Sequence, residues 1–459
     1  MILSRLTLHL QNKYTKMNDF TPWTLFTDVG IISLLLLLGK LIRVKLQIAQ
    51  RYFIPPSLIA GFMGLAFGPG GLGWLPLSNN MGTYASILIA FIFGCLPFAS
   101  STKSRENGSR IKRMWIYSQT GMLWQWAFGA LAGIGILSIF WPVAPYFGLS
   151  LPSGFCGGHG TAAAIGQAFS KMGGEDMMTL AMTCATVGIL SSVFIGLAII
   201  KWGTKKGYTS FLTTFEDLPH ELRTGLLPAD KRYSMGEAST SAISVDSLAF
   251  NIAIIAMVAL GGYGISKSVS FFLPQLEMPV FSCAFVFGIL MRFVFRKTGV
   301  LHYTSPRIIG HLSGTFTDFL VAFGISAIKL SVVLNYIVPL SILLICGLIL
   351  TLLYVLIVGR WLMKDDCWLE KALFTWGWFT GTVAMGIAML RVADPEHKSH
   401  CMEDYALAYL FIAPVEISLI TFAPVAFANG YGLHFGLLAL IAGACIMGYA
   451  WKNKETCSV

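Results

Sequence analysis

Ser153-Gly-Phe-Cys-Gly-Gly-His-Gly-Thr-Ala-Ala-Ala-Ile-Gly166 is a glycine-rich stretch in a chain whose other segments are mostly long and apolar. Lipid offers no water to irregular backbone, so such a stretch survives at membrane depth only where protein buries it or where it lines a cavity. The stretch therefore indicates a pore or a binding site within a membrane protein.

A second interrupted segment, Trp376-Gly-Trp-Phe-Thr-Gly-Thr-Val-Ala-Met-Gly386, occupies the matching place in the second half of the chain. Paired broken helices in two halves are typical of secondary transporters. With an odd number of spans in each half, two joined halves must lie in opposite orientations, so we expect an inverted repeat.

The composition fits this class of protein. The 459 residues are 55% hydrophobic and only 12% charged, and a soluble domain carries about twice that charged fraction. Several apolar runs approach or reach the ~20 residues that cross a bilayer. These runs include 22–39, 248–265 and 337–358. We therefore predict an all-α polytopic membrane protein.

The predicted layout has two halves of five spans, each with a re-entrant hairpin, and an extra C-terminal helix. The first half has spans at 22–43, 54–75, 82–101, 114–141 and 178–201, with a hairpin at 152–171. The second half has spans at 247–269, 279–297, 312–332, 335–360 and 404–427, with a hairpin at 372–391, and the extra span is 433–451. The corresponding units are an N-terminal extension (1–21), a first repeat (22–201), a linker (202–246), a second repeat (247–427) and a C-terminal helix with its tail (428–459).

Lysine and arginine fall mainly in alternate loops, which orients the chain by the positive-inside rule. We expect the linker and the C-terminus in the cytoplasm and the protein in a bacterial inner membrane. The net charge of +10 follows from these loops, so nucleic acid is not the expected partner. The nine cysteines are scattered singly and indicate apolar packing rather than disulfides or a metal site. HExxH, a Walker A lysine and GxSxG in a plausible setting are missing, so we do not expect an enzyme.

The first interruption offers an anion site. A half-helix beginning at Gly158-His159-Gly160-Thr161 would present free N–H groups and a positive dipole end to a carboxylate. Glycine lets a ligand approach the backbone closely. The alternative is a glycine-rich helix crossing. His159 faces the substrate or carries protons on the first interpretation, and is a satisfied structural residue on the second.

The second interrupted segment contains threonine hydroxyls that could bind a ligand. Thr380, Gly381 and Thr382 form the expected second tip, where hydroxyls and freed carbonyls bind a substrate or sodium, unless each hydroxyl bonds back to its own helix. Thr183, Thr186 and Gly188 lie on the span after the first break. They either complete a sodium shell or bond between helices.

Two carboxylates, Asp318 and Glu416, fall inside apolar spans. Charge within a membrane is costly and indicates a functional site by default. Each carboxylate is a candidate to bind a cation, carry a proton or meet a substrate ammonium. Pairing with a neighbouring helix, or a place near a span end, is the alternative.

Two motifs, Cys156-Gly-Gly-His-Gly-Thr-Ala-Ala-Ala164 and Met182-Thr-Cys-Ala-Thr-Val-Gly188, resemble the sodium/glutamate symporter family in a similarity that extends over about 25–430. The resemblance implies two inverted five-helix halves, hairpins meeting near the midplane, sodium-coupled uptake of glutamate with no organic cofactor, and a homodimer working by an elevator motion. From the residues themselves, we expect substrate at Ser153, Gly157, Gly158, His159, Gly160, Thr161, Thr380, Gly381, Thr382, Asp318 and Glu416, and sodium at Thr183, Thr186 and Gly188.

The chain departs from the family pattern at several places. The family's second loop resembles GATPTA followed by an asparagine, whereas this chain has Gly381-Thr-Val-Ala-Met-Gly386 and then Met389. Asp318 and Glu416 stand where the family tends to have uncharged residues. Another amino acid or organic acid, and coupling to protons in place of sodium, therefore stay open, as does a passive channel.

Overall fold

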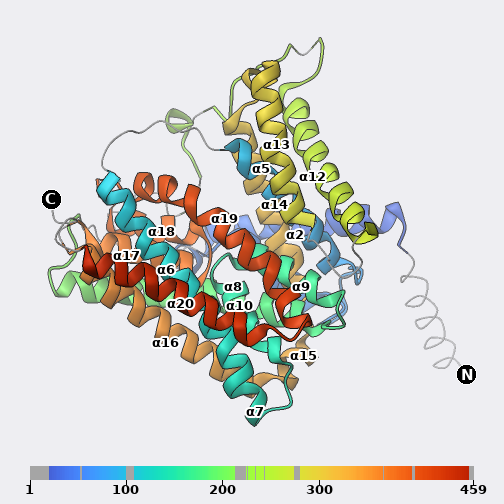
Figure 1. Cartoon of the computed structure of the whole chain (residues 1–459). Helices are drawn as coiled ribbons and strands as arrows, with labels where there is room; N and C mark the ends of the chain where they lie inside the picture. Colours follow the sequence, from blue (N-terminus) through green and yellow to red (C-terminus); the bar gives the residue numbers. More distant parts are fainter. Residues whose placement is uncertain are drawn as a thin grey trace, which may run out of the picture.

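The computed structural model describes residues 20–51, 54–99, 108–211, 224, 226–232, 234–241, 243–272, 280–364, 366–394 and 398–453. Most of the expected N-terminal extension, much of the linker and the end of the C-terminal tail lie outside these residues. Within them the chain is helical and contains no strand (Figure 1).

The helices of the first half begin close to where the hydrophobic pattern places them. They are α2 (Pro22–Lys45), α3 (Gln47–Arg51), α4 (Pro56–Phe67), α5 (Met81–Ala99), α6 (Gly108–Ala132), α7 (Ser138–Phe140), α8 (Ser150–Phe155), α9 (Gly158–Ser170) and α10 (Asp176–Lys205). A π-helical turn, Gly133–Leu137, joins α6 to α7, and a 3-10 turn, Pro145–Leu149, precedes α8.

The second half follows a similar order. Its helices are α12 (Ser247–Phe272), α13 (Val280–Thr298), α14 (Pro306–Ser326), α15 (Leu330–Asn335), α16 (Ile337–Leu362), α17 (Trp368–Thr380), α18 (Val383–Ala393), α19 (Cys401–Ala428) and α20 (Gly432–Lys452). Nine helices among the described residues are long and apolar enough to cross a membrane.

Three predicted spans have wrong boundaries, and one of them, expected at 114–141, begins earlier, at Gly108. The span expected at 54–75 is α4, which has only 12 residues, or about 18 Å of helix. It ends at the Gly68-Pro69-Gly70-Gly71 run, where glycine caps the helix and proline cannot continue it. The span expected at 312–332 begins earlier, because Ser305 caps α14 by accepting from Ile308 N and Pro306 suits the first helical position.

The helices form two bundles that each draw on both halves of the chain. The first bundle contains α2, α4, α5, α12, α13 and α14, which pack against one another, and the second contains α6, α8, α9, α10, α16, α17, α18, α19 and α20. In Figure 1, α5, α12 and α13 stand at the upper right and α6, α16 and α17 at the lower left. The bundles touch mainly where α9 packs on α5 and α14, and where α10 meets α14.

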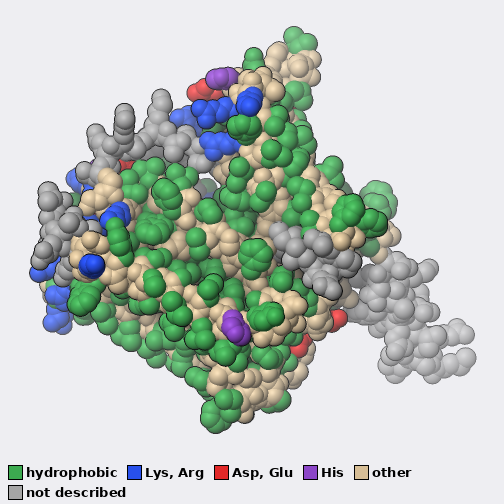
Figure 2. Space-filling model, viewed as in Figure 1, with side chains coloured by type: hydrophobic (Ala, Val, Ile, Leu, Met, Phe, Trp, Pro, Cys, Tyr) green, Lys and Arg blue, Asp and Glu red, His purple; other side chains and the backbone are tan. Residues whose placement is uncertain are grey.

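The surface agrees with a protein embedded in lipid. Hydrophobic side chains cover most of the face in Figure 2, and lysines and arginines gather toward its left edge and top. Large side chains such as Leu37, Leu350 and Leu438 are exposed on the long helices. Apolar surface of this extent is expected where hydrocarbon is the solvent.

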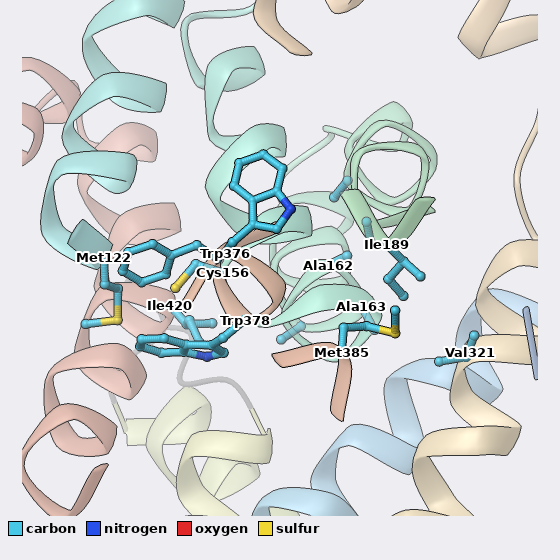
Figure 3. Close-up of a cluster of buried hydrophobic side chains, with 14 of the residues drawn as sticks. Met122, Cys156, Ala162, Ala163, Ile189, Val321, Trp376, Trp378, Met385 and Ile420 are labelled. Atoms are coloured by element: carbon cyan, nitrogen blue, oxygen red, sulfur yellow. The ribbon is translucent and has the colours of Figure 1, made fainter. Parts of the chain in front are cut away.

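The core lies around the two helix breaks. Figure 3 shows Trp376 and Trp378 of α17 beside Cys156 at the end of α8, with Met122 of α6 and Ile420 of α19 close by. Both indole rings are almost fully buried. Aromatic side chains of this size contribute much of the packing in a core, so the breaks lie in closely packed surroundings.

Candidate functional site

The first break separates α8 from α9. Helix α8 ends at Phe155, and α9 begins at Gly158 as expected from the sequence. Gly157 has φ +141° and Gly158 has φ +61°. These values are easy only for glycine, so the local sequence dictates both the break and its position.

The second break separates α17 from α18. Helix α17 ends at Thr380, and α18 begins at Val383 after Thr382, whose hydroxyl accepts from Met385 N. A Cβ added to Gly377 would lie 2.6 Å from Gly386 Cα. The two helices therefore pack backbone against backbone, and the chain turns back at Gly381.

The two breaks meet. A Cβ added to Gly158 would lie 2.6 Å from Thr382 Cγ2 and 2.7 Å from Gly381 O. A Cβ added to Gly188 of α10 would overlap Thr380 O. Segments that are far apart in sequence thus pack against one another at one point. They can approach this closely because glycine has no side chain.

A cavity of about 300 Å³ opens beside this meeting point. Gly157, His159, Gly160, Thr161, Trp378, Thr382, Val383, Tyr409 and Glu416 line it from the second bundle, and Ile89, Ile92, Phe93, Leu96, Ser313, Thr317, Leu320 and Val321 line it from the first. The cavity is therefore shared between the bundles, with most of its polar groups on one side.

His159 lines the cavity and is 1% exposed. Its Nε2 lies 3.0 Å from Thr186 Oγ1, and its Nδ1 has no protein partner. Thr186 Oγ1, which carries a single proton, also lies 2.9 Å from Met182 O. If the Thr186 proton goes to Met182 O, Nε2 of His159 is the donor to Thr186 and Nδ1 of a neutral ring is an acceptor; if it goes to Nε2, the two roles are exchanged.

Glu416 lies in the same cavity and is 6% exposed. Tyr409, one of the lining residues that the sequence analysis missed, donates its hydroxyl to Glu416 Oε2 at 3.1 Å. A Cβ added to Gly157 would lie 3.4 Å from Glu416 Oε1. Tyr409 stands seven residues before Glu416, and this two-turn spacing on one helix was the available signal.

Several predicted site residues use their hydroxyls elsewhere. The hydroxyls of Ser153, Thr183 and Thr380 donate to the carbonyls of Leu149, Thr179 and Trp376, respectively. Each bond joins residues four apart in the chain, which for Thr380 is the alternative stated above; Thr183 bonds within its own helix and not between helices. None of the three side chains is among the cavity-lining residues.

Asp318 does not join the other candidates. It is exposed on α14 near Ser57 and Lys40, and it is not among the residues that line the cavity. The structure therefore brings Glu416 to the first break and leaves Asp318 outside the cavity, near Ser57 of α4 and Lys40 of α2.

A buried ionic cluster at the start of α17 was not foreseen. Lys371 Nζ lies 2.5 Å from Asp366 Oδ2 and 2.9 Å from Asp404 Oδ2. Arg110 and Arg113 of α6 add bonds to Asp404 and Asp366, respectively. These ion pairs connect the N-terminal end of α17, called its base below, to α6 and α19.

A comparison with protein families matches residues 24–378 to the sodium/glutamate symporter model. The chain belongs to the sodium/glutamate symporter family. The match includes the first break and most of α17, while Gly381, Thr382 and Glu416 lie beyond it. A search of the curated proteins finds no match. Family membership makes this multi-pass membrane protein a transporter of a small molecule, with sodium as the coupling ion of the family.

Proposed function

We propose that this chain is a secondary active symporter, which uses a sodium gradient to move glutamate or a related amino acid or carboxylate into the cell. One observation carries the proposal: the tips of two broken helices meet beside a cavity that two bundles share. Interrupted helices at a site between repeats are the transporter arrangement that suits an anionic group and a cation together.

The substrate carboxylate belongs at the start of α9. The N–H groups of Gly158, His159 and Gly160 have no helical partner there, and the dipole of the 13-residue α9 favours negative charge. Gly157, Gly160 and Thr161 line the cavity at this helix start. Thr382 closes the site from the second tip.

Sodium belongs near the end of α17. The last carbonyls of α17 lack helical partners, and Thr380 O points at Gly188 of α10. The Thr186 hydroxyl lies on the same helix, two residues away. Hydroxyl and carbonyl oxygens are the ligands that hard cations prefer, which supports a sodium site in this region of α10 and α17.

An inverted repeat and an elevator motion complete the proposal. Helix α4 packs on α14, and α13 packs on α5 in the same way, as expected if the two halves are related by a two-fold axis. A site shared between two bundles changes sides when one bundle slides past the other. We propose that the second bundle carries the substrate, that the base of α17 faces the cytoplasm of a bacterium, and that two copies form a dimer.

A proton-coupled transporter of the same fold is the second candidate. The observation in its favour is the buried Glu416–Tyr409 pair in the cavity, since a carboxylate that gains and loses a proton is a common relay in transporters. Uptake that requires sodium favours the first candidate, and uptake that proceeds without sodium favours the second.

The test is uptake of labelled amino acids into proteoliposomes under an inward sodium gradient, with equal sodium on both sides as the control. We expect accumulation above the external concentration with the gradient alone. Uptake driven by a pH gradient without sodium would support the second candidate, and uptake that only equilibrates would indicate a channel.

A further inference from the structure

The charge of the cavity constrains the substrate further. Among the described residues that line it, Glu416 is the one carboxylate, and neither lysine nor arginine is present. Two acidic groups enclosed together repel strongly when water is scarce. A substrate with a second carboxylate, as in glutamate, would find no basic side chain among these residues to neutralise it.

Glu416 gives the cavity an acidic acceptor group. The Glu416 carboxylate accepts one hydrogen bond from Tyr409 and keeps further acceptor sites. This carboxylate complements an ammonium, which only donates. The start of α9 is the complementary feature, since it offers donors to a carboxylate.

The remaining wall of the cavity is apolar. It consists of Ile89, Ile92, Phe93 and Leu96 of α5 with Leu320 and Val321 of α14. Ser313 and Thr317 add two hydroxyls. A side chain resting against this wall is desolvated, which is costly for a charge and tolerable for a neutral group.

We propose, resting on the symport function above, that the substrate is a small zwitterionic amino acid with an uncharged side chain. Its ammonium lies toward Glu416, its carboxylate at the start of α9, and its side chain against α5 and α14. Glu416 excludes acidic amino acids, although the chain belongs to a family named for glutamate.

The experiment compares amino acids of matched shape. Dissociation constants for glutamine, glutamate, asparagine, aspartate and methionine are measured by thermal stabilisation of the purified protein in sodium. Wild-type protein should bind glutamine at least about tenfold more tightly than glutamate, and asparagine more tightly than aspartate, because the pairs differ mainly in one charge. Methionine should bind about as tightly as glutamine and asparagine.

Glu416→Gln supplies the second arm. It keeps the cavity shape and removes the charge, so the glutamine-to-glutamate preference should fall toward one. Glu403→Gln is the matched control on the same helix, since Glu403 is exposed, lies outside the cavity and pairs with His400 at 3.0 Å; it should keep the wild-type preference. The comparison uses only purified variants whose melting temperature without ligand equals that of the wild-type protein.

Each remaining outcome counts against a specific statement. Equal or tighter binding of the acidic members by wild-type protein would overturn the substrate class and leave symport standing. An unchanged preference in Glu416→Gln would overturn the role of Glu416. Failure of all five compounds, both in binding and in sodium-driven uptake, would overturn the proposed function together with this inference.

Discussion

Replacing Gly158 by alanine should reduce sodium-driven uptake to less than about a tenth of the wild-type rate. Gly158 has φ +61°, which costs an L-residue about 1–2 kcal/mol. Its new methyl group would also lie 2.6 Å from Thr382 Cγ2 and 2.7 Å from Gly381 O, and overpacking adds about 1–3 kcal/mol. The two tips could then meet only by shifting, and the site between them would lose its geometry.

Gly173→Ala is the matched control for Gly158→Ala. Gly173 also has a positive φ, +85°, but nothing lies within 4 Å of an added Cβ. It therefore carries the conformational cost without the contact, and uptake should stay close to that of wild-type protein. Rates are normalised to inserted protein. Equal uptake by Gly158→Ala and wild type would show that contact between the tips is not required.

Replacing Lys371 by methionine should lower the free energy of unfolding by about 3–5 kcal/mol, the usual cost of removing one partner from a buried ion pair. Lys371 is 1% exposed and bonds both Asp366 and Asp404. Its loss leaves these carboxylates with one arginine each among the bonds described above. The apparent melting temperature in detergent should fall clearly, and the base of α17 should become more accessible to proteolysis.

Lys364→Met is the control for the lysine substitution. Lys364 is exposed seven residues before Lys371, so the same change there should alter stability by less than about 0.5 kcal/mol. If Lys371→Met has the same melting temperature as the wild-type protein, the ionic cluster does not hold α17 in place.

The positions of both helix breaks could be predicted because their causes are local. Glycine at Gly157 and Gly158 permits backbone that other residues avoid, and Thr382 is a good helix cap. The early start of α14 was also signalled locally, by Ser305 followed by Pro306. The glycine run that begins at Gly68 was the local signal that α4 is short.

The partners in the site could not be predicted because they are brought together by tertiary packing. Nothing in the local sequence places Glu416 beside Gly157, or leaves Asp318 outside the cavity. Lys371 appears in sequence as an ordinary charge at the start of a helix, and only the fold brings Asp404 to it. Periodicity specifies which face of a helix is apolar, but not which distant helix covers it.

The central claim is that the cavity changes sides as the two bundles move relative to each other, and a reversible cross-link between them tests it most directly. A Cβ added to Gly82 of α5 would lie 3.9 Å from Met178 Cγ of α10, so Gly82→Cys with Met178→Cys joins the two bundles. Gly94→Cys with Val258→Cys is the matched control, because an added Cβ lies 3.8 Å from Val258 Cβ and both residues belong to the first bundle.

Both pairs are placed in a chain whose nine cysteines have been replaced and whose uptake is retained. Sodium-driven uptake is then measured before oxidation, after oxidation and after reduction. Oxidation should stop uptake in the Gly82–Met178 pair, reduction should restore it, and the Gly94–Val258 pair should transport throughout. Full uptake by a completely cross-linked Gly82–Met178 pair would contradict the account.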